Sequence, residues 1–151
     1  MKEEEQILIE LKEELDYLVK AFDTFSYAYN NCKKIGIKIE YSYDELDKWE
    51  AYTARFSRIS DIITQKIMNS IMILTEGYAG SLIDKANFAE QNGLVNKAAD
   101  FTKLRLLRNY IAHEYTKQNS NEIFEKVMNN YSILKELFDK ISQFCSKKIF
   151  V

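Results

Sequence analysis

The stretch that decides the fold runs from Ser42 to Leu74 and reads SYDELDKWEAYTARFSRISDIITQKIMNSIMIL. Ser42 followed three residues later by Glu45 is a capping box, in which each side chain accepts a hydrogen bond from the backbone N–H of the other residue. Neither proline nor glycine occurs between this cap and Gly77. We therefore expect a long helix from about Tyr43 to Leu74.

Helical patterns flank this stretch on both sides. From about Glu3 to Lys33, apolar residues recur in steps of three and four, which marks one face of an amphipathic helix that ends before Gly36. Ser81 and Asp84 open a short third helix, which Asn92-Gly93 closes in the left-handed conformation that glycine tolerates. Further helices are expected from about Asn96 to Tyr115 and from about Glu122 to Lys147. The fold class is thus all-α: an up-and-down bundle of about five helices in one domain spanning residues 1–151.

Composition agrees with this class and limits the function. The chain has no proline and 4 glycines, which favours a few long helices over many short strands. Its net charge is −2, whereas non-specific nucleic-acid binders usually carry a strongly basic face. Any contact with nucleic acid should therefore be confined to a small cationic patch.

Few residues are available to hold a metal. Cys32 and Cys145 lie near opposite ends of the sequence, and His113 is the single histidine, so we expect reduced thiols and neither a metal nor another cofactor. The N-terminus reads MKEEEQ, which is acidic where a secretory signal would be basic. No apolar run approaches the roughly 18 residues of a membrane span. We expect a cytoplasmic protein that does not enter a membrane.

The most informative chemistry lies on the fourth predicted helix. A helical wheel separates an apolar side (Leu104, Leu106, Leu107, Tyr110, Ile111) from a polar side (Arg105, Arg108, Asn109, Ala112, His113, Tyr115). Ala112 lies in the middle of the polar side, where a small residue between long ones leaves a shallow floor for a substrate. Asn109 and His113 are four apart, so the amide can hold one imidazole nitrogen. Arg108 and His113 are five apart and do not share a stripe.

An imidazole and a guanidinium suit cleavage of a phosphodiester. The imidazole of His113 can move a proton in either direction. The guanidinium of Arg108 can hold a phosphate through paired hydrogen bonds and stabilise negative charge on its oxygens. The two groups suit attack by a ribose 2′-hydroxyl, which would confine the reaction to RNA. The same residues also fit an ordinary solvated face, with Arg108 paired to Glu114.

Arg108-Asn-Tyr-Ile-Ala-His113-Glu-Tyr115 resembles the motif of HepT-type toxins of the HEPN superfamily, in which arginine, four residues, histidine, any residue and tyrosine follow one another. The upstream segment Ala54-Arg-Phe-Ser-Arg-Ile-Ser-Asp61 and the Asn92-Gly93 turn extend the resemblance, which covers roughly Trp49 to Tyr115. It implies a HEPN-type (HepT-like) helical domain.

The resemblance also implies an activity and partners. The implied activity is that of a metal-independent endoribonuclease toxin, whose substrate is an RNA such as a tRNA or an mRNA. The implied assembly is a homodimer in which the motif helices of two protomers line one cleft. Arg108 and His113 would be catalytic and Asn109 would orient the site. A minimal nucleotidyltransferase antitoxin would neutralise the toxin by transferring AMP to the motif tyrosine, which corresponds to Tyr115.

Three further arginines have two interpretations. Arg55, Arg58 and Arg105 could add positive charge to an RNA cleft, as the family-like segment suggests. Alternatively, Arg58 and Asp61 are three apart on one helix and could form a structural ion pair.

A second class of function stays open. The chain could be a non-catalytic helical subunit that docks a nucleotidyltransferase and presents a substrate or nucleotide to it. The acidic composition suits this interpretation, whereas an intact Arg108 and His113 pair favours the nuclease.

Overall fold

The computed structural model describes residues 2–114 and 120–151 and confirms the all-α class. Every regular element in these two ranges is helical. In chain order the helices are α1 (Lys2–Ile35), α2 (Tyr43–Asp61), the π-helical segment η1 (Ile62–Ile67), α3 (Met68–Glu76), α4 (Leu82–Gln91), α5 (Ala98–Glu114), α6 (Ser120–Asn129) and α7 (Tyr131–Lys148). Because α2, η1 and α3 form one rod and α6 and α7 nearly form another, the result is the expected bundle of about five helices.

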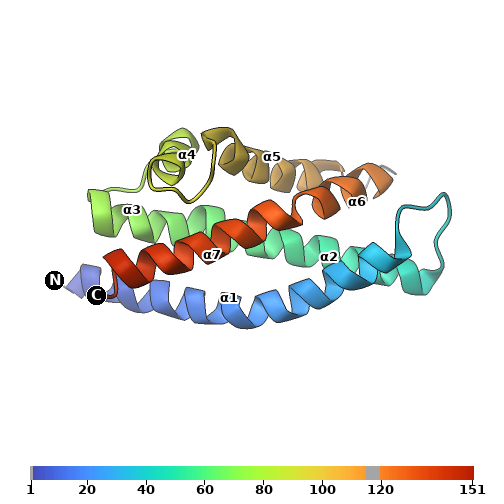
Figure 1. Ribbon diagram of the computed structural model, residues 1–151, viewed down its shortest axis with the longest axis horizontal. Coiled ribbons are helices and arrows are strands. Elements are labelled where there is room, and N and C mark those ends of the chain that lie inside the picture. The colour runs from blue at the N-terminus through green and yellow to red at the C-terminus, as the bar shows by residue number, and fades with distance from the viewer. Residues whose placement is uncertain (1, 115–119) are drawn as a thin grey trace.

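The rods run up and down along one long axis (Figure 1). The α1 rod, the rod of α2 with α3, and the rod of α6 with α7 form the body of the bundle. The shorter helices α4 and α5 lie together along one side of this body, opposite α1. The N- and C-termini lie at the same end. This arrangement leaves α5, which carries the motif, on the outside of the bundle with α2 beneath it.

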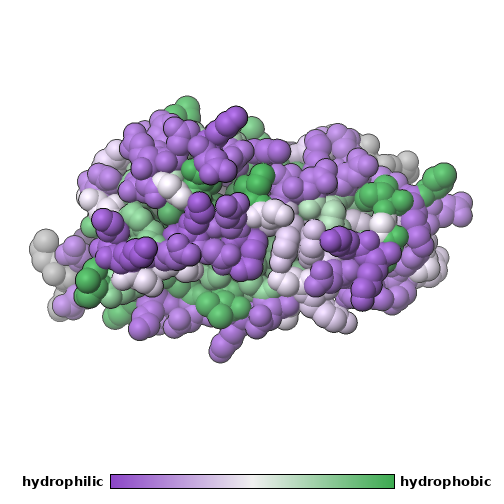
Figure 2. Space-filling model, in the orientation of Figure 1, coloured by the Kyte–Doolittle hydropathy of each residue, from purple (hydrophilic) through white to green (hydrophobic). Residues whose placement is uncertain are grey.

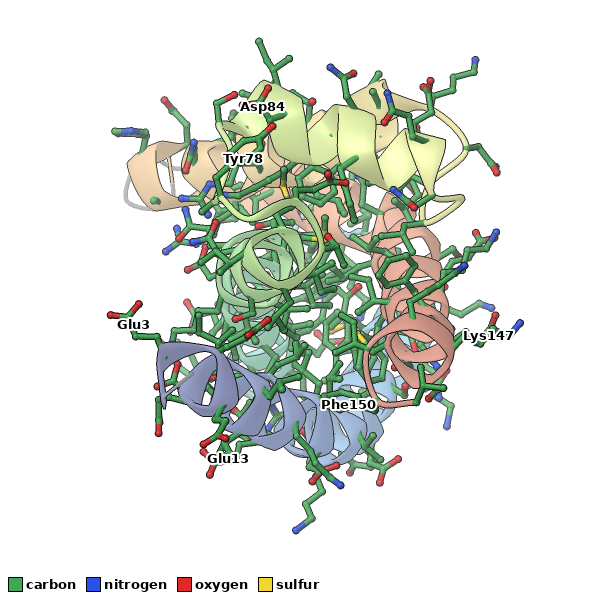
Figure 3. The ribbon with its side chains drawn as sticks, turned by 90° about the vertical axis from the view of Figure 1, so that its left-hand side faces the viewer. Glu3, Glu13, Tyr78, Asp84, Lys147 and Phe150 are labelled. Atoms are coloured by element: carbon green, nitrogen blue, oxygen red, sulfur yellow. The ribbon has the colours of Figure 1, made fainter. Side chains whose placement is uncertain are left out.

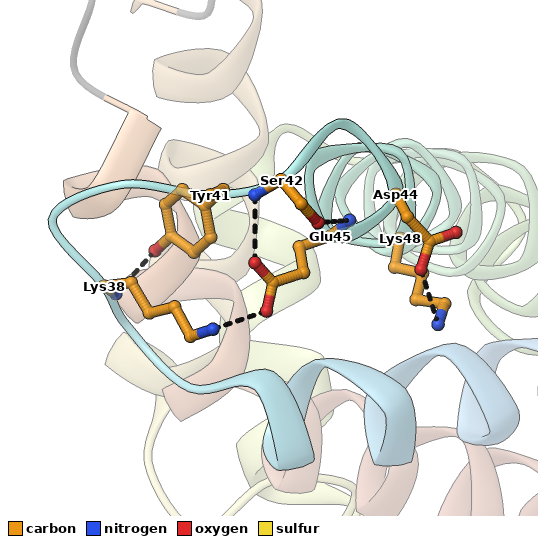
Figure 4. Close-up of polar contacts among 6 residues, drawn as sticks. All are labelled: Lys38, Tyr41, Ser42, Asp44, Glu45 and Lys48. Atoms are coloured by element: carbon orange, nitrogen blue, oxygen red, sulfur yellow. Dashed lines mark hydrogen bonds and ion pairs between the residues drawn. The ribbon is translucent and has the colours of Figure 1, made fainter.

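The predicted capping box at the start of α2 is formed. Ser42 Oγ accepts a hydrogen bond from Glu45 N at 3.1 Å, and Glu45 Oε1 accepts one from Ser42 N at 2.9 Å (Figure 4). Glu45 also pairs with Lys38 across the loop, and these hydrogen bonds lower the pKa of its carboxyl group. The loop between α1 and α2 is therefore tied to the first turn of α2.

Two rods contain irregularities that the sequence pattern did not predict. The long helix expected from Tyr43 to Leu74 continues to Glu76 but passes through the π-helical segment Ile62–Ile67. The last helix, expected from Glu122 to Lys147, begins at Ser120 and is interrupted at Asn130. A π-helical turn inserts one residue into the helix and rotates the faces that follow it.

One contiguous core links all the helices and is rich in aromatic rings. Phe25 stacks on Tyr52 with centroids 5.1 Å apart, and Trp49 stacks on Phe124 at 4.6 Å. The Tyr52 hydroxyl donates a hydrogen bond to the carbonyl oxygen of Val127 at 2.7 Å, which ties α2 to α6. Figure 3 shows charged side chains such as Glu3, Glu13 and Lys147 pointing outward, while apolar side chains fill the space between the helices.

Both cysteines are buried in this core as free thiols. Burial raises the pKa of each thiol to about 12, and Cys32 donates a hydrogen bond from its sulfur to the carbonyl oxygen of Lys48. Neither thiol is therefore a nucleophile near neutral pH.

The outer surface is mostly hydrophilic and is broken by small hydrophobic patches (Figure 2). Of the helices described, none combines the length and the apolar character needed to cross a membrane.

Candidate functional site

Helix α5 turns its apolar side toward the core and its polar side outward, as the wheel predicts, with one exception. Leu104, Leu107 and Ile111 are buried against the core, and Asn109, Ala112 and His113 are exposed. The exception is Leu106, which was expected on the buried side but is 59% exposed. It lies at the edge of the apolar side, where the neighbouring helices no longer cover α5.

Two arginines of α5 meet one carboxylate of α2. Asp61 Oδ1 lies 2.7 Å from Arg105 Nη1, and its two oxygens lie 3.0 Å and 2.9 Å from Arg108 Nε. The three side chains are only 20–36% exposed, so water screens them less than a surface pair. Asp61 is thus the centre of a charged cluster that fixes both arginines against the end of α2.

The π-helical segment supplies a second hydrogen-bond partner to Arg105. Gln65 lies within η1, and with its amide oxygen turned toward the guanidinium it accepts a hydrogen bond from Arg105 Nη2 at 2.7 Å. On α4, burial and the charge of Arg105 lower the pKa of Lys85. The guanidinium of Arg105 therefore donates hydrogen bonds to the side-chain oxygens of Asp61 and Gln65. These bonds link α5 to the end of α2 and to η1, in addition to the positive charge that Arg105 supplies.

Arg108 is held differently, because only its Nε is engaged. Neither Nη atom of Arg108 hydrogen-bonds to a residue within the described ranges. The side chain lines an open cleft of about 550 Å³ between α2 and α5. Asp61 orients the guanidinium from one edge and leaves the terminal donors available to a ligand, which is the arrangement that a phosphate clamp requires.

The rest of this cleft combines small and polar side chains. Ala54 and Ser57 of α2 face Ala112 of α5, and Glu50 lies at its edge. The Ser57 hydroxyl is buried and has no hydrogen-bond partner in the part of the chain that the structure describes. Ala112 thus contributes to a shallow surface beside Arg108, as the sequence indicates.

His113 follows Ala112 directly but does not join the cluster. Its side chain is exposed, and within residues 2–114 and 120–151 it makes no hydrogen bond with Asn109 or Arg108. The predicted amide–imidazole contact is therefore absent from this single chain. Tyr115, the residue expected to be modified, lies outside the described residues.

Arg55 and Arg58 lie on the other side of α2, in a hollow of about 230 Å³ between α1 and α2. Arg55 Nη1 donates a hydrogen bond to the Thr24 carbonyl oxygen at 3.2 Å. The Arg58 side chain is exposed, and no ion pair joins it to a described residue. The alternative in which Arg58 pairs with Asp61 is wrong, because Asp61 turns toward α5 and binds Arg105 and Arg108.

Sequence reasoning missed Asp61 as the partner of the motif arginine. A signal was present, because Asp61 is an acidic residue at the end of the family-like segment. Residue spacing along one helix cannot identify a partner on another helix, however, and the nearest cation along the chain was Arg58. Ser57 was missed for the same reason.

No protein-family model, curated protein or solved structure shows significant similarity to this chain.

Proposed function

We propose that this chain is a metal-independent endoribonuclease of the HEPN type and acts as the toxin of a toxin–antitoxin pair. The observation that carries the proposal is Arg108, which Asp61 holds through Nε beside an open cleft while neither Nη atom hydrogen-bonds to any of the residues described. His113, five residues later on the same helix, is exposed and supplies a group able to transfer protons. The motif resemblance of residues 108–115 supplies the reaction class.

The proposed reaction needs one proton transfer at each end of the phosphodiester. His113 accepts the proton of a ribose 2′-hydroxyl while the 2′-oxygen forms a bond to the adjacent phosphorus. The bond from phosphorus to the 5′-oxygen breaks, and that oxygen takes a proton from an imidazolium. The products are a 2′,3′-cyclic phosphate and a 5′-hydroxyl. Arg108 stabilises the charge that gathers on the phosphoryl oxygens.

A homodimer would complete the site. In the single chain, no contact among the described residues brings His113 to Arg108. A second copy whose α5 faces the first would supply a further arginine and histidine to a shared cleft, with Asn109 orienting the imidazole. Two histidines in one cleft would also provide a base and an acid for the two proton transfers.

Arg58 and Arg55 suit a supporting role in binding RNA. They lie beside Lys20 in the hollow between α1 and α2, and α2 separates this hollow from the Arg108 cleft. The phosphate backbone of an RNA that crosses α2 would therefore pass from the hollow between α1 and α2 to the Arg108 cleft. Arg105, held by Asp61 and Gln65, contributes positive charge behind Arg108.

Control of the toxin is proposed to act at Tyr115. Transfer of AMP to this tyrosine by a minimal nucleotidyltransferase antitoxin would place negative charge next to His113 in the sequence. The added group would compete for Arg108 and block entry of the RNA phosphate.

The decisive experiment combines growth and cleavage. The intact chain is expressed alone and the purified protein is incubated with total RNA in EDTA, beside His113→Ala and the control Asn87→Ala, an exposed position on α4. We expect growth arrest and cyclic-phosphate ends from the natural chain and from the control, and neither from His113→Ala. Absence of both effects from the natural chain would contradict the proposal and favour the docking subunit.

A further inference from the structure

The cleft between α2 and α5 carries side chains of opposite charge at its two ends. Arg108 lies at the end where Asp61 holds its Nε. Glu50 also lines the cleft, and it precedes Asp61 on the same helix by about 16 Å along the axis, at about 1.5 Å per residue. Because Asp61 keeps Arg108 near the last turn of α2, Glu50 marks the opposite end of the cleft.

Glu50 makes no polar contact within the part of the chain that the structure describes. Its side chain is exposed, and neither an ion pair nor a hydrogen bond joins it to residues 2–114 or 120–151. Two other acids of α2 differ in this respect. Glu45 completes the capping box with Ser42, and Asp61 binds two arginines. The carboxylate of Glu50 is therefore available to a ligand that enters the cleft.

A carboxylate at this position opposes binding of the phosphate groups of RNA, because like charges repel each other. The bases of RNA carry no such charge, and each of them has N–H groups that can donate hydrogen bonds to carboxylate oxygens. Ala54, Ile111 and Ala112 line the same cleft, and these small or apolar side chains suit the flat face of a base. Glu50 is thus better matched to a base, and Arg108 to a phosphate.

The four bases differ in how well they fit a carboxylate. On the Watson–Crick edge of guanine, the N1–H group and the exocyclic amino group lie side by side, so each can donate to one carboxylate oxygen. Adenine and cytosine place an acceptor nitrogen beside their amino group, and uracil has one N–H between two carbonyl oxygens. In these three bases an acceptor would face a carboxylate oxygen. Paired donors that meet a charged acceptor give the stronger and more specific contact.

We propose that Glu50 selects guanine at a fixed position next to the phosphodiester that Arg108 holds. The guanine donates hydrogen bonds from N1–H and from its amino group to the two oxygens of Glu50. Its Watson–Crick edge must be free of a pairing partner, so the RNA is single-stranded at this position. This inference rests on the proposed nuclease and adds the base that the nuclease recognises.

Cleavage of a random-sequence RNA pool tests the base preference. The cyclic-phosphate ends are sequenced after digestion by the natural chain, by Glu50→Gln and by Asp47→Asn. Asp47 is an exposed acid of α2 that does not line the cleft, so its variant controls for the loss of one negative charge. We expect the natural chain and Asp47→Asn to prefer guanine at one position about tenfold. Glu50→Gln should reduce this preference below about twofold, because an amide offers one acceptor and one donor.

A change of a single chemical group in the RNA tests the contact itself. Inosine keeps the N1–H of guanine but lacks the amino group, so inosine at the preferred position should lower kcat/KM of the natural chain about tenfold. The same replacement should have little effect on Glu50→Gln. Cleavage without guanine preference by the natural chain, or an equal preference in Glu50→Gln, would overturn this inference and leave the nuclease standing. Absence of cleavage by the natural chain would overturn both.

Discussion

Asp61 of α2 holds Arg108 of α5 through both carboxylate oxygens, which lie 3.0 Å and 2.9 Å from the arginine Nε. This contact joins two residues that lie 47 positions apart in the sequence, and it also decides which donors of Arg108 remain available to a ligand. Because the carboxylate occupies the Nε edge, the guanidinium cannot rotate freely, and its Nη atoms stay beside the cleft between α2 and α5. The same aspartate binds Arg105, so one residue orients two cations.

Replacing Asp61 should therefore affect both stability and activity. Asp61→Asn removes the charge and keeps the shape, and we expect it to lower the free energy of unfolding by about 1–2 kcal/mol, because hydrogen bonds to charged groups contribute about that much when partly screened. Urea unfolding measures the effect. The matched control is Asp139→Asn, whose pair with Lys135 lies on the exposed surface of α7 and should contribute less than about 0.5 kcal/mol.

In the cleavage assay, Asp61→Asn should lower kcat about tenfold and change KM little, because Arg108 still reaches the phosphate but is no longer held in place. Arg108→Lys should lose more, since lysine cannot bond Asp61 through a planar group while presenting two further donors. Equal kcat values for Asp61→Asn and the natural chain would show that Asp61 only stabilises the fold.

Replacing Arg58 tests whether the RNA backbone crosses α2 on its way to the Arg108 cleft. Its side chain is exposed and forms no ion pair in the described ranges, so Arg58→Ala should change the free energy of unfolding by less than about 0.5 kcal/mol. If the RNA backbone crosses α2, the same change weakens RNA binding and reduces the slope of log affinity against log salt by about 1. Binding is measured by fluorescence anisotropy with a catalytically inactive His113→Ala background. An unaltered salt slope would remove Arg58 from the interface.

Tyr52 should stabilise the contact between α2 and α6 through its hydroxyl as well as its ring. The hydroxyl donates to the Val127 carbonyl oxygen at 2.7 Å, and the residue is fully buried. We expect Tyr52→Phe to lower the free energy of unfolding by about 1 kcal/mol, the typical contribution of one buried hydrogen bond. Tyr43→Phe is the control, because Tyr43 is 90% exposed. Similar unfolding midpoints for the two variants would argue against this contribution.

The sequence predicted local features well because these depend on residues close together in the chain. The capping box at Ser42, the left-handed turn at Gly93 and the buried side of α5 all follow from spacing over a few residues. Prediction from the sequence failed where a contact with a distant segment of the chain determines the structure. Nothing in the helical periodicity places Asp61 against α5, interrupts the last helix at Asn130 or leaves Leu106 uncovered. For the candidate site, spacing identified the surface that carries Arg108 and Ala112 but not the carboxylate that orients the arginine.

The two buried thiols should make the fold sensitive to alkaline pH. Their side chains are 0% and 1% exposed, and burial raises the pKa of Cys32 and Cys145 from the ordinary value of 9.0 to about 12. Below pH 9 both states of the protein keep the thiols protonated, so these groups do not alter stability. Above pH 9 the unfolded chain loses the thiol protons while the folded chain retains them. The unfolded state then binds fewer protons, and stability falls as pH rises toward 12.

The measurement is the free energy of urea unfolding at several values between pH 7 and pH 11. Tyr52 changes stability in the same direction, because burial raises its pKa in the folded chain while the unfolded chain loses this hydroxyl proton near the ordinary value of 10.0, so the natural chain alone does not isolate the thiols. Cys145→Ala isolates one of them: its stability should be lower at pH 7, where a cavity is created, but should decline above pH 9 less steeply by about 1 kcal/mol per pH unit. Cys32→Ala should behave in the same way and should also lose the bond to the Lys48 carbonyl oxygen. Parallel declines in the natural chain and both variants would mean that the thiols ionise in the folded protein as readily as in the unfolded chain, and would contradict this prediction.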